Sequence, residues 1–149
     1  MRQETGLINV LLVDDDSLTH EMLELLLRQT EFSLRSAMNV AEAMSLIAAD
    51  TPDIIITDAM MPGESGFSLI EKVKSNLRTE NIPVILWTIM EKPDGSVMDA
   101  SGKADISVSK PLYLSDIMSG LQMAKQLIER KRVAKMSASQ ADEVIEVII

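Results

Sequence analysis

The sequence predicts an α/β protein built on a parallel β-sheet with helices on both faces. Short apolar runs, rich in β-branched residues, alternate about five times with segments of helical periodicity. Several of these runs are apolar throughout, which is typical of strands that are buried on both faces. Four of the five runs end in aspartate or threonine or are followed at once by lysine, so that polar residues collect where strands stop. These observations justify a doubly wound arrangement of strands and helices.

The expected elements follow one another in chain order. Strands are predicted over residues 7–14, 32–38, 53–58, 83–88 and 104–109. Helices are predicted over residues 17–30, 39–50, 65–76 and 113–132. Between the fourth and fifth strands, Pro93 and two glycines leave room for a short helix only.

The first helix allows more detailed expectations. Ser17 is the predicted N-cap, because its hydroxyl can accept a hydrogen bond from the first turn. The apolar face is predicted to consist of Leu18, Met22, Leu25 and Leu26. His20 has no metal-binding partner at a suitable spacing, so we expect it at the surface or at a boundary position.

The composition indicates a single globular domain with a short extra segment. The chain has 149 residues, of which 46% are hydrophobic, and its mean hydropathy is +0.13. Aromatic residues make up only 3%, so the core must be aliphatic. The absence of cysteine excludes disulfide bonds and thiolate metal sites.

The charge and the apolar runs limit the possible partners. A formal net charge of −9 argues against binding to nucleic acid or to anionic membranes, since both attract basic patches. No apolar run approaches the roughly 18–20 residues of a membrane span, and the first ten residues, MRQETGLINV, contain no signal-peptide stretch. We therefore expect a cytoplasmic protein.

Polar residues at the strand ends predict a site. Because the carboxyl ends of parallel strands meet at one edge of a sheet, five residues are expected together there. They are Asp14, Asp15, Asp58, Thr88 and Lys110. Adjacent carboxylates need a cation, and an all-oxygen site suits Mg²⁺, with Mn²⁺ as a possible substitute. A carboxylate beside a metal, an ammonium and a hydroxyl can attack phosphorus and form an acyl phosphate.

Two other aspartates are not expected in this site. Asp16 is predicted to be an exposed acid near the first helical turn, where negative charge complements the helix dipole. Asp53 begins a strand, which places it at the opposite edge of the sheet. The predicted site therefore uses only part of the Asp14–Asp16 triplet.

Four segments together resemble the receiver domain of two-component response regulators. They are VLLVDDD (10–16), PDIIITDAMMPGESG (52–66), PVILWT (83–88) and SKP (109–111). The similarity covers about residues 7–130, with a tail before it at 1–6 and a C-terminal tail or linker at 131–149. It implies the flavodoxin-like (CheY-like) fold, a doubly wound five-stranded parallel sheet in the order 2-1-3-4-5 with helices on both faces.

The resemblance also implies roles for the site residues. Asp58 would accept a phosphoryl group from a sensor histidine kinase or a histidine phosphotransfer protein. Mg²⁺ would be held by Asp14, Asp15, Asp58 and the backbone carbonyl of Met60. Lys110 would bind the phosphoryl group, and Thr88 would move toward it. Such a protein has no separate substrate; it catalyses its own phosphorylation and dephosphorylation and changes its binding to a downstream protein.

The sequence departs from the family pattern on the face that normally responds to phosphorylation. Ile89 follows Thr88 where a small residue is usual, and Ser107 stands where Tyr or Phe is usual. The helix between the last two strands is also expected to be short. These departures suggest that phosphorylation is retained while the threonine–aromatic relay is altered.

Two other functions compete with the phosphoacceptor. One is a pseudo-receiver, an interaction module that keeps the fold but is not phosphorylated, which Ile89 favours weakly. The other is a phosphatase with an aspartate nucleophile, which would need a second aspartate two residues after Asp58, where Met60 stands. The intact acidic pair and Lys110 favour the phosphoacceptor.

The C-terminal segment does not determine how the protein would pass its signal to a partner. The residues after about 132 are too few for a DNA-binding or enzymatic domain, so a single-domain regulator acting by protein contacts fits best. The ending DEVIEVII is apolar and could pair with another chain, giving a homodimer, or belong to a truncated linker.

Overall fold

The computed structural model shows a five-stranded parallel sheet in the order β2-β1-β3-β4-β5, as the sequence predicts. It describes residues 6–89, 99–110 and 114–148, with side chains for all of these except 114–115 and 136–148. The strands are β1 (Ile8–Val13), β2 (Phe32–Ala37), β3 (Ile54–Thr57), β4 (Val84–Thr88) and β5 (Ile106–Ser109). The helices of the described residues are α2 (Ser17–Leu27), α3 (Val40–Ala49), α4 (Gly66–Lys74) and α5 (Leu114–Ile148).

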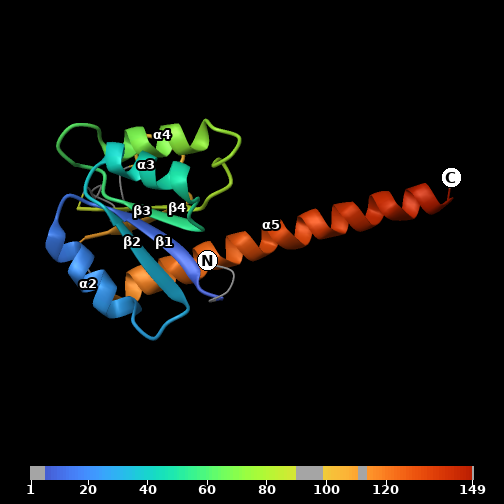
Figure 1. Ribbon diagram of the computed structural model, residues 1–149, viewed down its shortest axis with the longest axis horizontal. Helices are drawn as coiled ribbons and strands as arrows, with labels where there is room; N and C mark the ends of the chain where they lie inside the picture. The colour runs from blue at the N-terminus through green and yellow to red at the C-terminus, as the bar shows by residue number, and fades with distance from the viewer. Residues whose placement is uncertain (1–5, 90–98, 111–113, 149) are drawn as a thin grey trace.

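The helices cover both faces of the sheet (Figure 1). Alternate residues of β1 point to opposite sides: Leu11 packs with α3 and α4, whereas Leu12 packs with α2 and α5. Strands β3 and β4 are buried along their whole length, which explains their continuous apolar runs. The core is aliphatic as expected, and Trp87 is one of its largest fully buried side chains.

The buried face of α2 differs from the predicted one. Leu18 and Leu25 are 57% and 61% exposed, and Met22 is also exposed. The residues that turn toward the core are Thr19, His20, Leu23 and Leu27. The apolar spacing is ambiguous in this helix because leucines occupy both faces, and docking against the sheet selected the face that carries His20. The prediction that His20 lies at the surface or at a boundary position was therefore wrong, since only 8% of it is exposed.

Helix α5 is much longer than predicted. The expected helix ended at residue 132, but α5 continues to Ile148 and projects away from the sheet (Figure 1). The reason is local, because residues 133–148 contain no Pro or Gly and half of them are the strong helix formers Ala, Glu, Lys, Gln and Met. The predicted short helix between β4 and β5 falls largely on residues 90–98, which lie outside the described residues.

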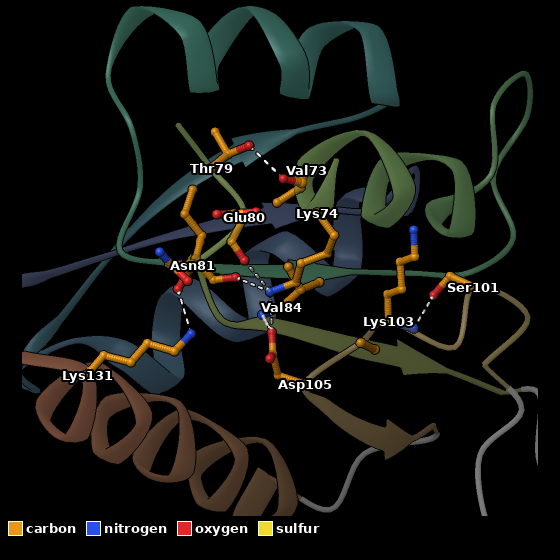
Figure 2. A network of polar contacts seen from close by, with 12 residues as sticks. Val73, Lys74, Thr79, Glu80, Asn81, Val84, Ser101, Lys103, Asp105 and Lys131 are labelled. Atoms are coloured by element: carbon orange, nitrogen blue, oxygen red, sulfur yellow. Dashed lines mark hydrogen bonds and ion pairs between the residues drawn. The ribbon is translucent and has the colours of Figure 1, made fainter. Parts of the chain in front are cut away.

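Polar contacts fix the edge of the sheet where β4 and β5 begin (Figure 2). Lys74 at the end of α4 donates to the carbonyls of Glu80 and Ile82 and to Asp105, at 2.7–3.2 Å. Asp105 in turn accepts from the backbone N–H of Val84 at 2.8 Å. This network ties α4 to β4 and β5 at the edge opposite the carboxyl ends of the strands.

None of the helices, over the residues that the structure describes, is both long enough and apolar enough to cross a membrane.

Candidate functional site

The carboxyl edge of the sheet gathers the predicted site residues. Asp14 follows β1, Asp58 follows β3, Thr88 ends β4 and Lys110 follows β5. Backbone bonds continue just beyond the strands: the Asp58 N–H donates to the Val13 carbonyl at 3.0 Å, and the Lys110 N–H donates to the Thr88 carbonyl at 2.8 Å. The ladder therefore places side chains from four strands at one edge.

Lys110 lies between two carboxylates. Its Nζ donates to Asp14 Oδ2 at 2.6 Å and is 3.5 Å from Asp58 Oδ2. The Asp14 side chain is almost fully buried, so its charge needs partners, and its other oxygen accepts from the Asp16 N–H at 2.9 Å. The ammonium thus offsets the repulsion that the adjacent carboxylates would otherwise suffer.

Three carboxylates could hold a metal ion. Asp14, Asp15 and Asp58 each offer an oxygen, and these oxygens all lie within 4.8 Å of one another. Asp14 is buried, Asp58 is partly exposed and Asp15 is exposed, so the group opens to solvent on one side. Hard oxygen donors with an open side suit Mg²⁺, which keeps several waters and binds phosphoryl oxygens. The residues present fit the predicted metal.

The environment of Asp58 disfavours its charged form. Burial raises the pKa of the Asp58 carboxyl above its usual range, the Lys110 ammonium opposes that rise, and the Asp14 carboxylate adds to it. The backbone N–H of Met60 approaches Asp58 Oδ1 at 3.4 Å, a long contact that lowers the pKa only partly. A divalent cation here would stabilise the carboxylate that burial disfavours.

We expect Asp58→Asn to stabilise the metal-free protein at neutral pH. The raised pKa means that ionised Asp58 lowers the free energy of unfolding. This loss of stability is absent below the ordinary aspartate pKa, where the carboxyl is protonated in both states. It grows as pH rises through the window between the ordinary and the raised pKa, and it is constant above that window. Urea unfolding with a chelator at several pH values should therefore show that the free energy of unfolding of the variant rises relative to that of the wild type as pH increases. A variant less stable than the wild type at neutral pH would contradict this prediction.

The Trp87 ring lies under the ammonium group of Lys110. The Lys110 Nζ lies 4.9 Å from the centre of the Trp87 ring, which is a cation–π distance, and Trp87 is completely buried in β4. The sequence alone did not reveal this contact, because Trp87 and Lys110 are far apart in the chain. Trp87 is the only tryptophan, so its fluorescence reports directly on this lysine.

Gly66 allows the chain to pass close to the backbone of Asp58. A Cβ atom at Gly66 would lie 1.8 Å from the Asp58 carbonyl oxygen, which is far inside contact distance. The Gly66 N–H donates to the Ala59 carbonyl at 2.9 Å, and the Thr57 hydroxyl donates to the Asp58 carbonyl at 3.0 Å. Helix α4 thus begins directly against the backbone of Asp58, and only glycine fits there.

Asp16 is exposed at the start of α2, as predicted, but it has a structural role that the sequence did not suggest. Asp16, not Ser17, is the N-cap of α2: its carboxylate accepts from the Leu18 N–H at 3.0 Å and from the Thr19 hydroxyl at 3.3 Å. His20 Nε2 bonds the Asp14 carbonyl at 2.7 Å. Both contacts fix the start of α2 next to the carboxylates of Asp14 and Asp15.

The other residues singled out from the sequence differ in how far they are exposed. Thr88 is completely buried at the end of β4, and the Met60 side chain is 59% exposed beside Asp58. Ile89 is 70% exposed, and Ser107 is exposed in β5 opposite Leu86. Asp53 lies at the other edge, where its carboxylate accepts from the Asn9 N–H at 2.8 Å, as its place at the start of a strand predicts.

Comparisons with known proteins agree with this geometry. The sequence pattern of the response regulator receiver domain matches residues 10–122. The chain is 33% identical over 109 residues to the response regulator PleD of Caulobacter vibrioides, covering 73% of this chain and 24% of PleD. It is 29% identical over 113 residues to the phosphate regulon transcriptional regulatory protein PhoB of Pseudomonas aeruginosa, covering 76% and 49%. The chain thus spans a quarter to a half of these curated relatives.

Solved structures show the same fold. A putative response regulator from Chloroflexus aurantiacus superimposes with a TM-score of 0.72 at 27% identity, over 79% of this chain and 97% of that one. The chemotaxis protein CheY4 of Vibrio cholerae gives a TM-score of 0.71 at 24% identity, over 79% and 98%, and at that identity it supports the fold alone. Fold, site geometry and sequence match together show that this chain belongs to the response regulator receiver domain family.

Proposed function

We propose that this protein is a phosphoacceptor switch in which Asp58 receives a phosphoryl group in a Mg²⁺-dependent reaction. The observation that carries the proposal is the placement of Lys110 between two carboxylates: its Nζ lies 2.6 Å from Asp14 Oδ2 and 3.5 Å from Asp58 Oδ2. Asp15 adds a third carboxylate, and one oxygen from each of the three aspartates lies within 4.8 Å of the others, close enough to share a metal ion. The phosphodonor would be a sensor histidine kinase or a histidine phosphotransfer protein, and the product would change binding to a downstream protein.

The reaction follows from the charges on the described side chains. An Asp58 oxygen attacks phosphorus in line with the bond to the donor nitrogen, which breaks as the acyl phosphate forms. The Lys110 ammonium, 3.5 Å from Asp58, can move from the carboxylate to a phosphoryl oxygen and balance its charge. Thr88, at the end of β4, can donate its hydroxyl to another of these oxygens.

Mg²⁺, held by Asp14, Asp15, Asp58 and the Met60 carbonyl, would supply further charge neutralisation for the transferring group. Asp14 and Asp15 then serve as fixed ligands, with Asp14 oriented by the Asp16 N–H and Lys110. Mn²⁺ could replace Mg²⁺ at such a site because both prefer oxygen ligands.

Incubation with Mg²⁺ and acetyl phosphate tests the proposal. We expect the mass of one phosphoryl group to be added to the wild type and not to Asp58→Asn, because the amide cannot form an acyl phosphate. A chelator should abolish the gain in the wild type. The absence of any gain in the wild type, together with an absence of Mg²⁺ binding, would instead indicate a pseudo-receiver.

We also propose that the phosphorylation signal leaves the site by an altered route. The exposed Ile89 follows Thr88, and the exposed Ser107 cannot supply an aromatic ring on β5. The receiver body would occupy residues 7–130 and act in the cytoplasm by protein contacts. The segment 131–149 would lie outside that body.

Amide NMR with and without beryllofluoride tests this route. We expect the shifts at 104–115 to be small compared with those around Asp58, because no aromatic side chain on β5 follows Thr88. Large shifts concentrated at 104–115 would show that the usual relay operates despite Ser107.

A further inference from the structure

The end of α5 extends beyond the sheet. Ile117, Leu121 and Ala124 are completely buried against the sheet, but residues 129–135 are all exposed. Lys131 donates to the Asn81 carbonyl at 3.2 Å at the edge of the receiver body (Figure 2). We call residues 131–148 the stalk. Lys131 and Arg132 still lie against the body, where they line pockets with Asn81 and Leu7 respectively. In Figure 1 no other described element lies beside the projecting end of the stalk.

The stalk continues the seam by which α5 packs on the sheet. In the body this seam is formed at intervals of three and four residues by Ile117, Gly120, Ala124 and Leu127. In the stalk the same intervals give Lys131, Ala134, Ala138, Ala141, Ile145 and Ile148. Five of these six stalk positions are Ala or Ile. A seven-residue repeat of small and apolar residues, on a helix end beside which no described element lies, is the pattern of a coiled-coil seam.

Charge along the stalk indicates what covers this seam. Residues 130–135, RKRVAK, carry four positive charges and no negative one, whereas residues 142–146, DEVIE, carry three negative charges and no positive one. The residues between, 136–141, are uncharged. Two stalks side by side in parallel would oppose like charges at both ends, whereas antiparallel stalks would oppose unlike charges. The stalk is therefore complementary to a second copy of itself running in the opposite direction.

The seam residues fit the same antiparallel register. With one layer formed by Ala138 and the partner's Ala141, the next layer places Ala134 against the partner's Ile145. Large residues thus meet small ones, which keeps two helices close without overpacking. Flanking the seam in this register, Lys135 would face the partner's Asp142, an opposite charge. Parallel stalks would instead pair Lys131 with Lys131 inside the seam.

We propose that two copies of this chain associate through antiparallel pairing of their stalks. The two receiver bodies then lie at opposite ends of the paired helices, and both Asp58 sites stay open to a phosphodonor. The pairing does not depend on phosphorylation, so its test is independent of the function proposed for Asp58.

Sedimentation equilibrium of the full chain tests the association. We expect a dimer that weakens as salt rises, because the end charges contribute to pairing. Ala138→Asp puts a charge in the seam and should raise the dissociation constant by about tenfold or more. Ser139→Asp makes the same charge change one residue away, off the seam, and should leave most of the association. Thermal unfolding of both variants checks that the receiver body stays folded.

Cysteine cross-linking tests the direction, since the chain has no cysteine of its own. A mixture of Ala134→Cys and Ile145→Cys chains should form a disulfide between the two variants, because these positions share a layer. Each variant alone should not, since antiparallel stalks separate identical positions by about 16 Å. A disulfide formed by Ile145→Cys alone would overturn the antiparallel register. A wild-type chain that stays monomeric at high concentration and low salt would overturn the pairing itself.

Discussion

Neutralising Asp15 should abolish Mg²⁺-dependent phosphorylation, whereas neutralising Asp16 should leave most of it. Asp15 is one of the three carboxylates whose oxygens lie within 4.8 Å of one another, and Asp16 is not. Asp15→Asn removes a charged metal ligand, so we expect the rate of phosphorylation by acetyl phosphate to fall by about a hundredfold or more. Phosphoprotein formation over time, measured by intact mass at several Mg²⁺ concentrations, provides the comparison.

Asp16→Asn is a closely matched control. It removes the same charge from the neighbouring residue, and asparagine caps a helix as well as aspartate does, so α2 keeps its hydrogen bond from Leu18. Both residues are exposed, and we expect neither change to unfold the protein. Trp87 fluorescence during a Mg²⁺ titration adds a second measurement, because Lys110 lies over its ring. Equal losses in the two variants would show that the triplet is not divided between metal binding and helix capping.

Gly66→Ala should destabilise the protein by about 3 kcal/mol and displace the backbone of Asp58. The added Cβ would lie 1.8 Å from the Asp58 carbonyl oxygen and 3.0 Å from Thr57 Oγ1. A backbone oxygen cannot rotate away as a side chain can, so either α4 or the strand end must move. Urea unfolding measures the loss of stability, and phosphorylation by acetyl phosphate should slow as Asp58 leaves its position beside Lys110.

Gly120→Ala makes the same chemical change in another helix and should have the opposite effect on stability. Its Cβ would meet Val108 Cγ2 at 3.4 Å, which that side chain can accommodate. Alanine is favoured over glycine inside a helix, so stability should rise by up to about 1 kcal/mol. A Gly66→Ala protein as stable as Gly120→Ala would show that the approach of α4 to Asp58 is not tight.

Local patterns predicted the order of elements well but failed where two faces of a helix were both apolar. The runs of β3 and β4 could only be buried strands, and their ends placed Asp58 and Thr88 correctly. In α2, leucines line more than one face, so the spacing could not show that His20 and Leu23 turn inward. The length of α5 could have been predicted from its sequence, because residues 133–148 contain no Pro or Gly that would end a helix.

The sequence by itself determined the fold class, the strand ends and the residues of the candidate site, because a parallel sheet brings its carboxyl ends to one edge whatever the details of packing. Only the tertiary structure decided how those residues are supported. Trp87 lies under Lys110, Gly66 admits α4 against Asp58, and His20 bonds the Asp14 carbonyl. These contacts join elements that are distant in the chain, and their existence depends on distances of a few ångströms that no local spacing encodes.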